Sequence, residues 1–107
     1  MGIFVHESDF LTKQPGGAQL IGPDQGATKG FCIGITFYDK ETYNPPGVHD
    51  DQEGFYVLAG EGFAKVGDEE FELRPGAAYI AQAGVPHSVK KKPGSKPVKL
   101  LWSHGAV

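Results

Sequence analysis

The sequence contains little cysteine and no long hydrophobic run. Cys32 is the only cysteine in 107 residues, so the chain cannot form an internal disulfide, which fits a reducing compartment. No segment approaches the roughly 20 consecutive apolar residues that a membrane-spanning helix needs. The N-terminal segment also lacks the order of a secretory signal, in which a basic stretch precedes an apolar one. We therefore expect a cytoplasmic protein with no membrane partner.

The sequence also lacks an excess of positive charge. Ten lysines and arginines stand against 13 aspartates and glutamates, for a net charge of −3, and both signs are scattered along the chain. A nucleic-acid-binding surface concentrates positive charge, so we expect no nucleic-acid partner. The length suits one domain, and neither repeats nor linkers divide the sequence. We expect residues 1–107 to form that single domain.

Glycine and proline are abundant, and they are spread along the chain. The 16 glycines and 8 prolines punctuate short β-prone runs, a rhythm typical of an antiparallel sandwich or barrel. Strands are predicted over residues 31–38, 55–58, 62–66, 69–73, 77–81, 88–90 and 98–102. Residues 1–30 suggest loops around one or two edge strands. No segment carries a helical apolar period, so the sequence predicts an all-β protein.

Two glycines predict particular turns between these strands. Gly67 suits the first central position of a type II′ hairpin turn, which requires a positive φ. Gly76 follows Pro75, the usual order of a type II turn. Residues 53–91 are therefore expected to form a meander of short strands.

Two histidines and a glutamate carry the strongest chemical signal. His49 precedes Glu53 by a short turn, and His87 follows a later turn. Imidazole and carboxylate are ligands of iron(II), zinc, nickel and manganese, and three such ligands leave coordination positions open. We expect all three side chains to face the barrel interior and hold one divalent ion. In the alternative interpretation, Glu53 accepts bonds from turn amides, His49 is exposed at the rim, and His87 packs as a neutral core imidazole.

The stretch from residue 45 to residue 91 resembles the cupin family, which is marked by two short motifs. The matching positions are Glu53 and Gly60 in the first motif and Gly76, Gly84 and His87 in the second. The resemblance implies a double-stranded β-helix, the jelly-roll barrel of the cupins. It also implies that His49, Glu53 and His87 are metal ligands.

Three positions depart from the family pattern. Gly47 stands where the first motif has another histidine, Gln82 where the second has proline, and Lys91 where the second often has asparagine. The family's usual fourth ligand is therefore absent. Asp51, His6 and His104 are candidates to replace it, although Asp51 also suits a turn and the two histidines lie near the chain ends, His104 near a frayed C-terminus.

Two classes of function remain open at this point. In the first, a mononuclear metal site acts on a small molecule as an enzyme of the dioxygenase, isomerase or lyase type, because the fold alone does not choose the reaction. In the second, the barrel is a non-catalytic binding module for a small metabolite, with or without metal. Gly47 favours the second, since a weakened ligand set is tolerable where no chemistry depends on it. The family resemblance further suggests a homodimer that pairs through sheet edges.

Overall fold

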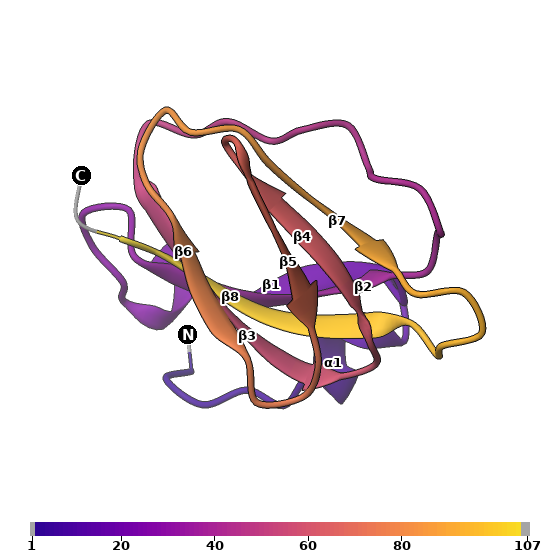
Figure 1. The fold of residues 1–107 in the computed structure, drawn as a ribbon. Coiled ribbons are helices and arrows are strands. Elements are labelled where there is room, and N and C mark those ends of the chain that lie inside the picture. Colours follow the sequence, from indigo (N-terminus) through magenta and orange to yellow (C-terminus); the bar gives the residue numbers. More distant parts are fainter. Residues whose placement is uncertain (1, 106–107) are drawn as a thin grey trace.

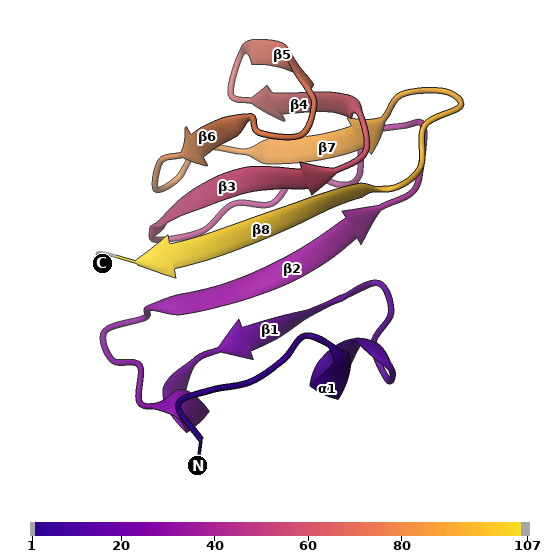
Figure 2. The same cartoon turned by 90° about the horizontal axis from the view of Figure 1, so that it is seen from below.

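Two antiparallel sheets dominate the computed structural model, which describes residues 2–105 (Figure 1). The larger sheet has the strand order β1-β2-β8-β3-β6, and the smaller has the order β5-β4-β7. Within the described residues the strands are β1 (Gly17–Ile21), β2 (Cys32–Tyr38), β3 (Gln52–Ala59), β4 (Gly62–Val66), β5 (Glu69–Leu73), β6 (Ala78–Ala81), β7 (His87–Lys91) and β8 (Val98–Gly105). Figure 2 shows β8 lying between β2 and β3. The predicted all-β class is confirmed.

Helix is scarce, and it is confined to the N-terminal region. The elements are α1 (Ser8–Leu11) and the 3-10 turn η1 (Pro23–Gln25), on either side of the edge strand β1. The sequence predicted an edge strand and loops here, and the single helical turn of α1 is too short to produce an apolar period. In the described part of the chain, neither helix has the length and apolar character needed to cross a membrane.

Strand boundaries agree best with the sequence where glycine and proline mark the turns. β4 and β5 occupy the predicted residues. β3 and β8 are longer than predicted, because β3 begins at Gln52 and β8 continues to Gly105. His104 therefore lies inside β8, opposite Cys32 of β2 and Glu53 of β3. The expectation of a frayed end at His104 is wrong, because strands on both sides extend β8.

The two predicted glycine turns are present. Gly67 has a φ of +57°, and the residues flanking the turn, Val66 and Glu69, are paired across the β4–β5 hairpin. Gly76 has a φ of +95°, and Ala77 N donates to Arg74 O at 3.0 Å. Both glycines thus take the positive φ that the predicted turns require.

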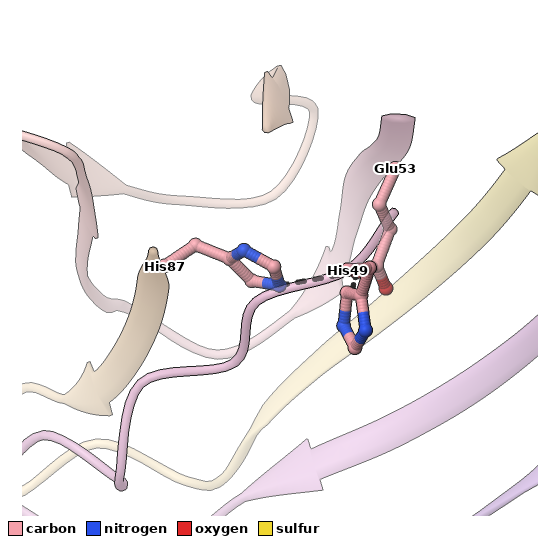
Figure 3. Close-up of side chains that lie close together, drawn as sticks. All are labelled: His49, Glu53 and His87. Carbon is pink, nitrogen blue, oxygen red and sulfur yellow. Dashed lines mark ion pairs between the residues drawn. The ribbon is translucent and has the colours of Figure 1, made fainter. Parts of the chain in front are cut away.

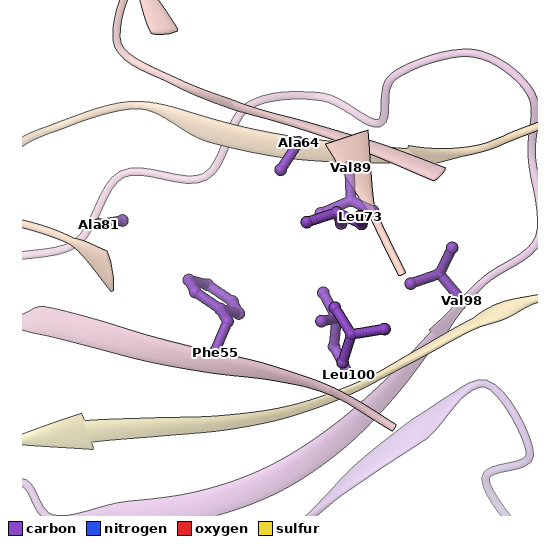
Figure 4. Packing of buried hydrophobic residues seen from close by; sticks show 8 residues of the cluster. Phe55, Ala64, Leu73, Ala81, Val89, Val98 and Leu100 are labelled. Carbon is purple, nitrogen blue, oxygen red and sulfur yellow. The ribbon is translucent and has the colours of Figure 1, made fainter. Parts of the chain in front are cut away.

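The core lies between the two sheets (Figure 4). Its buried side chains are Phe55, Val57, Ala64, Leu73, Ala81, Val89, Val98 and Leu100. Successive strand residues face opposite sides, so Phe55 and Val57 share the inner face of β3 with Glu53. Glu53 is 6% exposed and is the one buried charged residue in the part of the chain that the structure describes. The interior is therefore apolar along most of its length and charged at one end.

The apolar face of β2 lies on the outside of the larger sheet. Thr36 is opposite the core residue Leu100, so Ile35 and Phe37 point the other way. Ile35 is nevertheless only 4% exposed. On the same outer side, Lys99 Nζ donates to both Glu7 carboxylate oxygens at 3.0 and 3.1 Å, and this pair holds the N-terminal segment against the sheet.

Truncating a core leucine should destabilise the fold far more than truncating a surface one. Leu100 is fully buried, and we expect Leu100→Ala to lower the free energy of unfolding by about 2–5 kcal/mol, since it leaves a cavity. Leu58 is 41% exposed on β3, and Leu58→Ala should cost roughly 0.5 kcal/mol. Urea unfolding followed by circular dichroism measures both. Equal losses would contradict the inner and outer faces assigned to these strands.

Candidate metal centre

A backbone bridge joins the segment before β3 to the start of β7. Gly47 N donates to His87 O at 2.9 Å, and His87 N donates to Gly47 O at 3.0 Å. Gly47 is two residues before His49, and His87 is the first residue of β7, so the bridge holds the backbone next to His49 against the start of β7. The rings of His49 and His87 therefore lie close together, with centroids 5.1 Å apart. Glu53 comes from the other sheet, as the second residue of β3.

The structure brings the three predicted ligands together (Figure 3). The Nε2 atoms of His87 and His49 lie 3.1 and 3.4 Å from Glu53 Oε1. One possible ligand atom from each of the three residues lies within 4.8 Å of the other two. The three atoms are thus close enough to bind one ion. The Glu53 side chain is 8% exposed and that of His49 is 42% exposed. The cluster is thus closed at the carboxylate and open to solvent at His49.

The donor atoms of this cluster fit a cation. Glu53 Oε1 is buried and has no hydrogen-bond partner among the described residues, although two imidazole nitrogens lie near it. His87 Nδ1 lies 3.1 Å from Val85 O, which only accepts, so Nδ1 carries a proton and Nε2 is the nitrogen available to bind a metal ion. An unpaired buried carboxylate is costly, and a divalent ion between these donors would compensate that cost.

A third imidazole contacts the other oxygen of the same carboxylate. His104 Nε2 is 3.2 Å from Glu53 Oε2, and His104 Nδ1 is 2.9 Å from Asp51 Oδ1. The sequence named both residues only as possible replacements for a ligand missing at Gly47. Every second residue of β8 faces inward, and Leu100 and Trp102 belong to this inward series. His104 is the next member, and this alternation is the sequence signal that could have placed it on the inner face. His6 lies apart from the cluster, exposed in the N-terminal turn with Nδ1 2.9 Å from Ser8 Oγ.

The cluster lines a cavity of about 300 Å³. Tyr38, Phe55 and Trp102 form much of its wall. Asn44 also borders it, but both ends of its amide are engaged, since Oδ1 accepts from Val89 N at 2.7 Å and Nδ2 donates to Pro45 O at 3.0 Å. Asn44 therefore fastens the loop before Gly47 to β7. The volume of the cavity is at the lower end of the range for small-ligand sites.

Two other titratable side chains lie near the site, and both are held in their neutral forms. Burial raises the pKa of Tyr38, the negative charge of Glu53 raises it further, and a hydrogen bond with Thr36 acts in the opposite direction. The Tyr38 hydroxyl is therefore a proton-bearing donor at neutral pH. Burial also raises the pKa of Cys32, which is not among the residues that line the cavity. A protonated thiol is a poor nucleophile and a poor metal ligand.

The cavity wall depends on a glycine in β2. Gly34 lies opposite Trp102, and a Cβ at Gly34 would come within 2.1 to 2.6 Å of the indole ring. The missing side chain lets the indole lie across β2, where its Nε1 donates to Thr36 Oγ1 at 2.9 Å. Gly34 thus fixes the shape of the wall beside His104, whose ring centroid is 5.5 Å from that of Trp102.

The two sheets and the polar cluster at one end agree with a family model. The model described as the cupin domain matches residues 35–104. The chain belongs to the cupin family. The predicted jelly-roll barrel is therefore confirmed, and the solved structures that resemble this cupin support it. No curated protein matches the sequence.

Three solved structures illustrate the likeness. The polyketide cyclase RemF from Streptomyces resistomycificus is 25% identical, with a TM-score of 0.74 over 99% of this cupin and 81% of that chain. The Cnp3 cupin domain of Schizosaccharomyces pombe is 20% identical, with a TM-score of 0.72 over 85% of this cupin and 60% of that chain. The DMSP lyase DddQ from Ruegeria pomeroyi DSS-3 is 24% identical, with a TM-score of 0.71 over 84% of this cupin and 46% of that chain. This cupin thus spans less than two thirds of the latter two chains.

Adding one methyl group at Gly34 should displace the indole from the cavity wall. We expect Gly34→Ala to shift the fluorescence emission of Trp102, the only tryptophan, to longer wavelength and to lower stability by roughly 1–3 kcal/mol, because the site becomes overpacked. Gly54→Ala is the matched control, since a Cβ at Gly54 meets nothing within 4 Å. Emission and stability that stay unchanged in Gly34→Ala would contradict this packing.

Proposed function

We propose that this cupin binds one divalent metal ion through His49, Glu53 and His87 and acts on a small organic molecule beside it. The observation that carries the proposal is the buried Glu53 Oε1, which has two imidazole nitrogens within 3.4 Å and no hydrogen bond. Two imidazoles and one carboxylate suit iron(II), zinc, nickel or manganese. When bound, such an ion supplies a Lewis acid or an oxygen-binding centre.

The surrounding residues have separate tasks in this proposal. The solvent-exposed side of the cluster, at His49, is the side by which a small molecule enters. Phe55 and Trp102 give the cavity an apolar wall. The neutral Tyr38 hydroxyl donates a hydrogen bond to an oxygen of the bound molecule. The cavity of about 300 Å³ limits the molecule, or the part of it that enters, to one at the small end of the usual ligand range.

The likeness to RemF supports an enzyme over a passive binding module. RemF is a polyketide cyclase, and its similarity extends over 99% of this chain. The metal-free alternative rests on Gly47, which provides no ligand. A Cβ at Gly47 would lie 3.3 Å from His87 Nε2 and 3.4 Å from His49 Nε2, so the glycine keeps a side chain from crowding the two donors.

Location and assembly remain predictions. We expect a cytoplasmic homodimer, and the larger sheet offers two edges, β1 and β6, for pairing with a second copy. On β6, Ile80 is 50% exposed.

Metal content measured by mass spectrometry tests the ligand set. Protein purified without an affinity tag should contain, or take up, close to one ion per chain from iron(II), zinc, nickel or manganese. His49→Ala, His87→Ala and Glu53→Gln should each lose most of that metal, because each change removes one of the proposed ligands. His6→Ala is the control and should retain it, since His6 lies outside the cluster. A wild-type protein that takes up none of these ions would refute the proposal.

A small anion tests whether the bound ion has an open position near Tyr38. Azide added to the cobalt(II)-loaded protein should change its visible spectrum. Tyr38→Phe should weaken azide binding by roughly 2- to 10-fold, because one hydrogen-bond donor is lost. Tyr56→Phe, on the outer face of β3 and 44% exposed, should leave the affinity unchanged. Equal azide affinity in the wild type and Tyr38→Phe would exclude the hydroxyl as a donor to the bound molecule.

A further inference from the structure

His104 and Asp51 form a hydrogen-bonded pair beside the Oε2 atom of Glu53. His104 lies opposite Glu53 in the β3–β8 pairing, so the two side chains leave neighbouring strands on the same inner face. The His104 ring is 4.9 Å from that of His49, measured between centroids. His104 thus borders the same site as His49, Glu53 and His87.

The hydrogen bond to Asp51 determines which His104 nitrogen faces the site. Asp51 Oδ1 lies 2.9 Å from His104 Nδ1, and an ionised carboxylate only accepts, so Nδ1 carries the proton. Nε2 is then the nitrogen that faces Glu53 Oε2, 3.2 Å away, and the one whose lone pair can bind a metal ion. Val85 O acts on His87 in the same way. Metal-binding histidines are commonly oriented by such an acceptor on the other ring nitrogen.

We propose that His104 is the fourth metal ligand and that Asp51 is the positioning residue that orients it, an inference that rests on the proposed function. The compact donor group contains His49, Glu53 and His87 but not His104, because His104 approaches Oε2 and the other two imidazoles approach Oε1. Coordination requires His104 to move toward the shared ion from the Oε2 side. The ligand set is then three imidazoles and one carboxylate.

Charge balance supports a role for both carboxylates. The side chains of Glu53 and Asp51 are 8% and 16% exposed, and burying two negative charges is costly without compensation. One divalent cation with three neutral imidazoles balances both of them. The imidazole that Gly47 lacks would thus be supplied by β8, far along the chain, and an ion that takes more than four ligands would keep positions for water or a small molecule.

X-ray absorption of the cobalt(II)-loaded wild-type protein tests the ligand set without any substitution. Scattering from the imidazole rings distinguishes three coordinated histidines, the expected result, from two. In parallel, cobalt(II) affinity is measured by competition with a chromophoric chelator. His104→Ala should weaken binding by at least about 100-fold, and Asp51→Ala should weaken it by about 10- to 100-fold. Asp51→Asn should recover most of the affinity, because its amide oxygen accepts the same N–H.

Asp50→Ala is the matched control for the aspartate, since Asp50 is its exposed neighbour, and it should bind cobalt(II) as the wild type does. An absorption spectrum with two imidazoles overturns the inference while leaving His49, Glu53 and His87 in place. Unchanged affinity in His104→Ala overturns it in the same way. A wild-type protein that folds, by circular dichroism, but takes up no metal refutes the proposed function and this inference together.

Discussion

The end of the barrel that holds the site is organised around one buried carboxylate. Glu53 occupies an inward position on β3 in a row that continues with Phe55 and Val57, where a hydrocarbon side chain would satisfy the pattern. A charge there requires compensation, and both sheets contribute side chains that could hold a compensating cation beside it. His87 comes from the smaller sheet, His104 from the larger, and His49 from the segment between β2 and β3. The polar cluster and the apolar core are therefore consecutive parts of the same interior.

The bridge between Gly47 and His87 complements this arrangement. It holds the loop before β3 on β7 through backbone atoms alone, so the loop needs no side chain at position 47 to stay in place. In the family pattern that side chain is a histidine. Its loss in this chain removes a donor without loosening the loop, because the bridge and the amide of Asn44 keep the loop in place. The groups that position the loop are thus different from the candidate metal donors.

The sequence predicted most of the strands, and it predicted that His49, Glu53 and His87 lie together, because both leave local marks. β4 and β5 are bounded by Gly67 and the Pro75-Gly76 pair, whose backbone preferences define the turns. The far end of β8 has no such mark, since its extent is determined by pairing with β2 and β3, which lie far away in the sequence. His104 was consequently assigned to a frayed end. Its contact with Asp51 joins residues 53 positions apart, and no local pattern encodes it.

The central position of β8 has a consequence for how the chain is made. β8 follows all the other strands in sequence, yet it lies between β2 and β3. During synthesis, β2 and β3 therefore leave the ribosome with one edge each unpaired, and they cannot join into one sheet until residues 98–105 emerge. Unpaired edges invite association with other chains. The nascent protein is consequently most exposed to misassembly just before the strand that carries His104 is complete.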